Sequence, residues 1–541
     1  MTAKLQIQTR VRRLVYYVED IEKGLIQIPA FQRDFIWNSN DKLNLFDSIK
    51  RGYPIGSILF WRPKDESFES NPIIGTYQIP APENEYFFIL DGFQRLSTLF
   101  GCLVNPIKTK LQRNLDEWYK NGFNVCYDLE TEEFFIPRSN REEKLLPYQV
   151  HVYDLIDTRF SFTFQRELLK KEFDENLVNI YLDRYEKLGT TFIDYQIPSI
   201  DITGGEIDEA VEIFSRVNSK GAKISPDWMI SALTYDKEKG FRLGSLIDDL
   251  FTELAIYNFT PDFSIKRDLI LKCITNSFGK AYFDQSSKIE DLARRSDFID
   301  VTLKTIESIK SAVKFLFEEL LVLNGSLLPY GPQLIFITDF FNAIPNPSTK
   351  QIEQLKKWFW ITTYSGYFTI YSLSKVREAY YVFQQFLLGM PVDPVYNDRP
   401  SIPFSVSEFP NKIYMGSVRA KSLILFLLNS SNQFNSVNLK NADGLILSYL
   451  FFDIKDEKGN NPPESVVPMI ENEETRQYKK MKDVSELLAN YSEYNTKYLI
   501  KEEMVLSFQN GDKKNVLKLR KEEIIEKERF FVQSLGLKYE Y

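Results

Sequence analysis

Asp91, Gly92, Gln94 and Arg95 follow one another closely, and the segments around them predict a place that could bind an anion. The apolar run over residues 86–90 predicts a short buried strand, and Asp-Gly is a turn signal. The apolar spacing from Gln94 onward predicts a helix. A strand, a tight turn and a helix start together form a place where backbone N–H groups and the helix dipole favour a negative charge. On local grounds alone, Arg95 could equally be a solvated arginine or the partner of an acid.

A second Gln-Arg pair, Gln32 and Arg33, stands upstream among aromatic residues. A possible strand over residues 25–28 precedes it, and capping residues after it predict a helix over residues 41–51. Each Gln-Arg pair therefore lies beside a helix start, and the two could converge on one polyanionic ligand. Arginine suits that task because its planar fork grips phosphate oxygens in pairs.

Several segments of the chain resemble the GmrSD-type restriction endonuclease N-terminal domain family, a ParB-like lineage. They are Ile-Pro-Ala-Phe-Gln-Arg-Asp-Phe-Ile-Trp at 28–37, Asp-Ser-Ile at 47–49, Gly-Tyr-Pro-Ile-Gly-Ser at 52–57, Leu-Asp-Gly-Phe-Gln-Arg-Leu-Ser-Thr-Leu at 90–99 and Phe-Ser-Arg-Val-Asn-Ser-Lys-Gly-Ala-Lys-Ile-Ser at 214–225. Their order also fits, and the resemblance is strong over residues 1–235. The family's loop usually reads Asp-Gly-Gln-Gln-Arg, whereas Phe93 replaces the first Gln here and removes one polar contact.

Members of that family bind nucleotides, and some hydrolyse them, in defence against modified phage DNA. The resemblance therefore implies a nucleoside triphosphate with Mg²⁺ on its phosphates, and DNA as a further partner. The catalytic residues that it implies are Asp91, Gln94 and Arg95. The nucleotide-binding residues that it implies are Phe31, Gln32, Arg33, Gly92, Thr98, Asn218 and Gly221.

Local explanations stand beside these roles. Asp91 could serve the turn, Asp47 could pair with Lys50 or Arg51 on its own helix, and residues 218–221 could form a turn between helices. The metal ligands stay unassigned, although Asp91 and then Asp47 are the acids best placed for Mg²⁺.

Histidine chemistry is almost excluded. The chain has one histidine, His151, in an aliphatic and aromatic context that favours a structural role. The His-Asn-His nuclease of many relatives needs a histidine base, and residues 411–541 contain no histidine. We therefore expect no nuclease of that kind. The sequence also lacks a Walker loop and a dinucleotide-binding fingerprint.

Composition indicates a packed globular protein of 541 residues, with 43% hydrophobic and 15% aromatic residues. The net charge of −8 implies that any contact with DNA uses a local patch or a partner. Three scattered cysteines give no sign of a zinc module or a disulfide framework. We expect a cytoplasmic protein, because there is no signal-peptide core and no apolar run of membrane-spanning length.

The predicted fold class is α+β. We expect a ParB-like nucleotide-binding domain with a small mixed sheet over residues 1–235, a helical domain over 236–400 and a C-terminal helical region over 401–541. Within these regions, residues 12–23 should form a short helix, residues 391–410 a proline-rich linker, and residues 515–525 a helix with a solvated or partner-facing charged face. A C-terminal region without the expected nuclease residues favours self-association or the docking of a companion protein.

Two functions fit best. The first is a nucleotide-binding, NTP-hydrolysing protein of a prokaryotic anti-phage or restriction-type defence system. The alternative is a non-enzymatic module that senses nucleotide or modified DNA and triggers a partner effector. A third possibility, a nuclease built from carboxylates alone, lacks a convincing Asp and Glu-x-Lys arrangement. Phosphate release from each NTP, with and without DNA, separates the first two.

Overall fold

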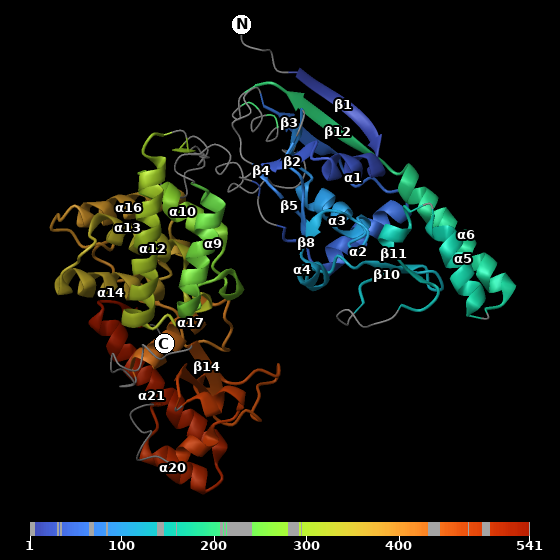
Figure 1. The fold of residues 1–541 in the computed structure, drawn as a ribbon. Helices are drawn as coiled ribbons and strands as arrows, with labels where there is room; N and C mark the ends of the chain where they lie inside the picture. The colour runs from blue at the N-terminus through green and yellow to red at the C-terminus, as the bar shows by residue number, and fades with distance from the viewer. Residues whose placement is uncertain are drawn as a thin grey trace. The chain divides into compact units, whose positions relative to one another are not determined.

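A computed structural model provides the fold of the chain (Figure 1). The structure describes residues 6–29, 32, 35–63, 70–82, 85–137, 145–157, 159–171, 173–205, 209, 213, 241–279, 292–293, 295–430, 444–473, 475–489 and 498–539. The chain divides into two compact units, Met1–Gly244 and Ser245–Tyr541. Small mixed sheets with helices make up the first unit and helices dominate the second, so the predicted α+β class is confirmed.

A six-stranded mixed sheet, in the order β1-β12-β3-β7-β2-β4, is the frame of the first unit. Its strands are β1 (Gln6–Arg13), β12 (Gln196–Thr203), β3 (Ile58–Arg62), β7 (Phe87–Asp91), β2 (Ile26–Pro29) and β4 (Ser70–Asn71). The pairs β12–β3 and β7–β2 are parallel, and the other neighbours are antiparallel. The mixed sheet predicted for this region is therefore present.

Helices and two small sheets complete the first unit. The helices are α1 (Leu14–Glu22), α2 (Ser39–Lys50), α3 (Phe93–Leu103), α4 (Leu115–Lys120), α5 (Phe160–Lys170), α6 (Glu175–Asp194) and the 3₁₀ turn η1 (Val152–Asp154). The small sheets are β10 (Glu133–Phe135), β9 (Cys126–Asp128) and β11 (Gln149–His151), and β5 (Ile73–Ile74), β6 (Tyr77–Gln78) and β8 (Gln112–Arg113). The helix predicted from residue 12 begins two residues later, because Arg12 and Arg13 still pair with β12.

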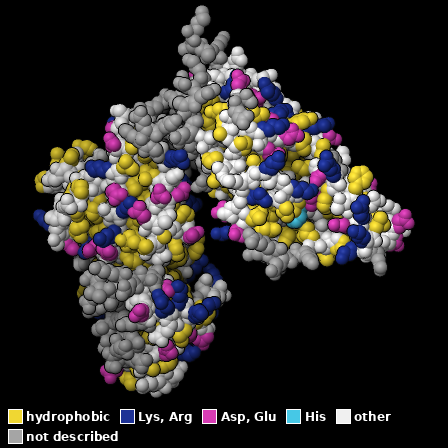
Figure 2. Space-filling view, viewed as in Figure 1, with side chains coloured by type: hydrophobic (Ala, Val, Ile, Leu, Met, Phe, Trp, Pro, Cys, Tyr) yellow, Lys and Arg dark blue, Asp and Glu magenta, His cyan; other side chains and the backbone are white. Residues whose placement is uncertain are grey.

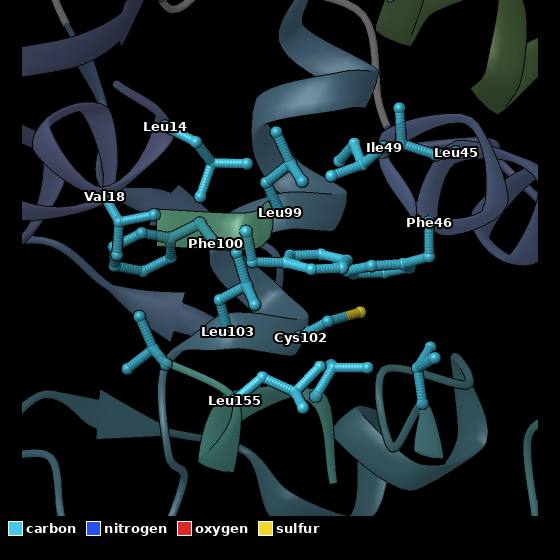
Figure 3. Close-up of a cluster of buried hydrophobic side chains, with 14 of the residues drawn as sticks. Leu14, Val18, Leu45, Phe46, Ile49, Leu99, Phe100, Cys102, Leu103 and Leu155 are labelled. Carbon is cyan, nitrogen blue, oxygen red and sulfur yellow. The ribbon is translucent and has the colours of Figure 1, made fainter. Parts of the chain in front are cut away.

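The helix α3 runs through the core of the first unit. Figure 3 shows Leu99, Phe100 and Leu103 of α3 between apolar side chains of α1 and α2. Every residue of α3 except Arg95 is buried. Packing on all sides holds this helix rigidly, so the position of its first turn is well determined.

Helices form most of the second unit. They are α9 (Leu243–Leu254), which begins at the boundary, α10 (Arg267–Ser277), α12 (Phe298–Leu320), α13 (Gly331–Ala343), α14 (Thr349–Tyr364), α15 (Tyr367–Ile370), α16 (Leu373–Leu387), α17 (Val418–Ser430), α20 (Glu502–Gln509) and α21 (Lys513–Ser534). The 3₁₀ turns are η2 (Ala255–Tyr257), η3 (Pro261–Phe263), η4 (Gly325–Leu327), η5 (Pro463–Ser465), η6 (Arg476–Lys480) and η7 (Ser485–Leu488). Within the described part of the chain, no helix is both long enough and apolar enough to span a membrane.

Two strand pairs interrupt the helices of the second unit. The antiparallel pair of β14 (Gly444–Tyr449) with β15 (Val466–Glu471) lies in a region that we predicted as mainly helical. The strand β13 (Ser405–Val406) pairs with β16 (Lys538–Tyr539), so the proline-rich segment contacts the end of the chain instead of separating two units. The division into three domains stays a prediction.

The charged terminal helix, α21, differs most from its prediction. Its residues Arg520, Glu523 and Glu528 are buried, with Glu528 fully so. The expectation of a solvated or partner-facing charged face over residues 515–525 is therefore wrong for Arg520 and Glu523. Periodicity shows which residues share a helix face but not what other segments cover that face.

Candidate nucleotide-binding site

The junction of β7 and α3 has the geometry of an anion-binding turn. Asp91 ends β7, and Gly92 is the N-cap of α3 in the left-handed region at φ 89°. A Cβ on Gly92 would lie 2.4 Å from Cδ1 of Ile58, so both the backbone angle and the space require glycine. No side chain caps α3. Its first turn therefore keeps the positive end of the helix dipole uncovered by a side-chain acceptor.

Arg95 lies in this first turn and is held on two sides. Its Nη1 donates to the backbone oxygen of Ile55 at 2.7 Å, and its Nη2 lies 3.2 Å from Oδ2 of Asp91. The Arg95 side chain is 17% exposed, and burial lowers its pKa while the Asp91 carboxylate acts in the opposite direction. The guanidinium still carries its charge at neutral pH and has further N–H donors. It is a cation held by two contacts, with a small part of its side chain exposed.

Gly56 lets Arg95 take this position. Its φ is +87°, and a Cβ on it would lie 2.5 Å from Nη1 of Arg95. Gly52, at the other end of the same connection from α2 to β3, also has a positive φ, but a Cβ there would meet no atom within 4 Å. Of these two glycines, only Gly56 is required for the approach of the arginine.

The glutamines of the two Gln-Arg pairs each bind the backbone of the other segment. Oε1 of Gln94 accepts from the backbone N–H of Ile36 at 2.9 Å and of Trp37 at 3.3 Å. Nε2 of Gln32 donates to the backbone oxygens of Ile89 at 2.9 Å and Leu90 at 3.4 Å. We call these four hydrogen bonds the glutamine clasp. The clasp joins the segment after the first Gln-Arg pair to the strand before the second.

Lys42 is a buried residue of this region that sequence reasoning missed. Its Nζ donates to the backbone oxygen of Trp37 at 2.8 Å and lies 5.1 Å from the ring centroid of Phe35 and 5.4 Å from that of Phe123. Burial lowers the pKa of Lys42. Its burial could have been predicted from its spacing from Phe46, since residues four apart share a helix face. Lys42 and Gln94 therefore both bind the backbone of residues 36–37.

The remaining predicted residues differ in how far the structure describes them. Phe31, Arg33, Asn218 and Gly221 lie outside the described residues. Thr98 is fully buried, and its hydroxyl has no hydrogen-bond partner in the described structure. The roles predicted for these residues and for Gln32, Gly92, Asp91, Gln94 and Arg95 stay predictions.

Phe93, which stands where the family's loop usually has Gln, is 7% exposed and belongs to the hydrophobic core of the first unit. Asp47 forms an exposed ion pair with Arg51 at 2.8 Å, as its local explanation predicted. His151 lies half-buried, with Nδ1 3.2 Å from Sγ of Cys126. Burial lowers the pKa of His151 to about 4 and raises that of Cys126, so the two form a neutral pair rather than an activated thiolate.

Few side chains at the junction could act as ligands of a metal ion. Among the residues that the structure describes, no three His, Cys, Asp or Glu side chains are grouped to hold one. Asp91, whose side chain is 35% exposed, is the acid at the junction. This arrangement fits Mg²⁺, which commonly takes one or two carboxylates and completes its shell with phosphates and water.

Residues 15–235 match the sequence model of the GmrSD restriction endonuclease N-terminal domain. The first unit thus contains a GmrSD-type domain. The resemblance predicted from the ordered motifs is confirmed, and the β7–α3 junction and the clasp both lie inside the matched range. An uncharacterized protein of Methanocaldococcus jannaschii is similar over 423 residues at 21% identity, covering 71% of this chain and 69% of the relative. The similarity to that protein extends beyond the length of the GmrSD-type domain.

Proposed function

We propose that the GmrSD-type domain binds a nucleoside triphosphate at the β7–α3 junction and hydrolyses it in a restriction-type defence system. The observation that carries the proposal is the glutamine clasp. It ties both Gln-Arg segments to one another, and Arg33 directly follows Gln32 in the chain. The clasp holds the backbone after the first Gln-Arg pair beside the strand that leads to Arg95, and we infer that both segments contribute to one nucleotide site.

In this proposal each group has one task. Phosphate oxygens lie at the start of α3, where the backbone dipole and the exposed part of Arg95 favour negative charge. Asp91 holds Mg²⁺ against the phosphates. Gln94 acts as a positioning residue, because its Oε1 already accepts two backbone N–H groups. When bound, Mg²⁺ supplies neutralisation of the phosphate charge during transfer to water.

The family also supports a contact with DNA. We propose that the ligand-bound protein acts on modified phage DNA, directly or through a companion protein. On the face shown in Figure 2, Lys and Arg side chains are interspersed with Asp, Glu and apolar ones. That mixture supports recognition through a local patch rather than through bulk positive charge.

A non-enzymatic sensor is the second candidate, and the Arg95–Asp91 ion pair favours it. An arginine that is already paired can bind a phosphate without supplying the extra charge that hydrolysis requires. Phosphate release by the purified protein distinguishes the two. Turnover of an NTP supports the hydrolase, whereas binding without turnover supports the sensor.

The binding site itself is tested by Arg95→Ala. Losing a charge-assisted hydrogen bond to phosphate costs about 1.5–3 kcal/mol, so calorimetry should show affinity for NTP lowered roughly tenfold or more. The matched control is Arg51→Ala, which removes an arginine with the same four-residue spacing from its aspartate, in an ion pair on the exposed face at the end of α2. Thermal unfolding of both variants shows whether the fold is kept. Equal affinity in Arg95→Ala and Arg51→Ala would refute the site.

A further inference from the structure

A surface cavity of about 560 Å³ opens in the second unit, between α14 and the segment after α16. One side is polar and comes from Lys350, Gln354 and Lys357, which share a face of α14 because they are spaced by four and three residues. The other side includes Met390 and Val392. Cavities of this volume and mixed lining are typical of small-molecule sites.

The two lysines of the cavity are unpaired. Neither Lys350 nor Lys357 forms an ion pair or hydrogen bond with any residue that the structure describes. Lys356, between them on α14, behaves differently and pairs with both Glu319 and Glu353. Glu353 lies three residues after Lys350 and four before Lys357, but it pairs with Lys356. The cavity keeps two positive charges for another partner.

A buried aromatic side chain, Trp358, also contributes to the cavity. It lines the cavity, is fully buried, and packs on Phe336 and Phe383 with ring centroids 5.4 and 5.0 Å away. Its indole Nε1 has no acceptor in the described structure. A buried indole N–H normally finds one, because an unmade hydrogen bond in the interior costs free energy. This Nε1 atom is itself buried, so it does not face the open part of the cavity.

We propose that this cavity binds a small organic anion with an apolar body. Its anionic group, a phosphate or carboxylate, lies between Lys350 and Lys357, and its apolar body lies against Met390 and Val392. Asp393 also lines the cavity and accepts from the backbone N–H of Val395 at 2.9 Å. Its charge disfavours an anion at that end, which places the anionic group at the α14 end. The site is separate from the β7–α3 junction and does not depend on its function.

The probe for this proposal is 1-naphthyl phosphate, titrated calorimetrically into the full chain, with 1-naphthol as the uncharged comparison. We expect the double variant Lys350→Gln, Lys357→Gln to weaken binding of 1-naphthyl phosphate by about tenfold and to leave 1-naphthol unchanged. Lys304→Gln, a change to an exposed lysine of α12, is the matched control and should bind like the unaltered protein. Gln354→Trp should fill the cavity and abolish binding of both probes.

Two results would overturn the proposal. One is the absence of binding heat from 1-naphthyl phosphate at millimolar concentration. The other is equal affinity in the double lysine variant and in Lys304→Gln, since binding would then not involve the cavity lysines. Loss of affinity in the double variant, with retained affinity in the control and the same thermal unfolding, supports it.

Discussion

Two Asp-Arg pairs share the same four-residue spacing but differ in their surroundings: Asp47–Arg51 and Asp91–Arg95. The first pair lies on the exposed face of α2, where salt and water weaken it. The second lies at the start of a buried helix, with Arg95 held against the backbone oxygen of Ile55. Burial makes the second pair a candidate for binding because its geometry is fixed before any ligand arrives.

Gly56→Ala should weaken NTP binding much more than Gly52→Ala. Both changes place a side chain at a positive φ and should cost about 1–2 kcal/mol of stability. Only the Cβ at residue 56 would collide with Nη1 of Arg95, at 2.5 Å. Calorimetric affinity and denaturant unfolding of the two variants check this. A similar loss of affinity in both would show that Arg95 does not need its observed position.

Asp339 should make the second unit less stable as the pH rises. It is buried and accepts from Oη of Tyr380 at 2.7 Å and from the amide of Asn276. Burial raises the pKa of Asp339 from 3.8 to about 7. The folded state therefore keeps the proton up to about pH 7 while the unfolded chain releases it near pH 3.8. The contribution of protonated Asp339 to the free energy of unfolding is fully present below pH 3.8 and is lost as the pH rises through 7.

Asp339→Asn should flatten that dependence, since an amide oxygen can accept the same two hydrogen bonds without gaining a charge. Denaturant unfolding at pH 5 and pH 8 provides the measurement. Asp262→Asn, at an exposed position, is the control and should follow the unaltered protein. An unchanged slope between the two pH values in Asp339→Asn would contradict the assignment.

At the scale of elements, one buried carboxylate joins segments that are far apart in the sequence. Glu528 of α21 is fully buried and binds Arg419 of α17 through both oxygens, at 2.7 and 2.6 Å. The hydroxyls of Tyr364 of α14 and Tyr539 of β16 each donate to it at 2.9 Å. A carboxylate with four hydrogen bonds from three elements holds the end of the chain against the helical layer.

Glu528→Gln should destabilise the protein by about 3–5 kcal/mol, because Arg419 would keep its buried charge without a counter-charge. Lys513→Gln removes one partner of the exposed Lys513–Asp453 pair and should cost no more than about 1 kcal/mol. Denaturant unfolding compares the two. The double change Arg419→Met, Glu528→Leu should recover part of the stability lost in Glu528→Gln. If Glu528→Gln loses no more stability than Lys513→Gln, the buried pair contributes little.

At the scale of the whole molecule, the predicted role of residues beyond about 411 in association needs an intact chain. Truncation near Pro410 would remove β16, the partner of β13, and Glu528, which accepts a hydrogen bond from Tyr364 of α14. A truncated protein could then lose its fold rather than its contacts. Coupling between nucleotide and assembly requires only that the assembled and free forms differ in nucleotide affinity.

We therefore expect light scattering of the full chain to show a different mass with saturating NTP than without it. Arg95→Ala should reduce this difference at the same NTP concentration, and Arg51→Ala should not. An identical mass under all conditions would leave the C-terminal region without the predicted role in nucleotide-dependent association.

Local sequence determined much of this protein. The turn at Asp91-Gly92 and the helices beside both Gln-Arg pairs could be predicted, since each depends on residues near in the chain. The ordered motifs likewise predicted the GmrSD-type domain that the family comparison confirms. The pairing of Arg95 with Asp91 was one of two local alternatives that the sequence left open.

Tertiary structure alone decided which of these residues meet. Nothing in the sequence shows that Gln94 binds the backbone at Ile36 and Trp37, that Lys42 donates to the backbone oxygen of Trp37, or that Glu528 pairs with Arg419. Each contact joins a side chain to a segment brought near by packing. Periodicity indicates which face of a helix or strand a residue occupies. The partner on that face depends on packing between distant segments, which the pattern of one segment does not specify.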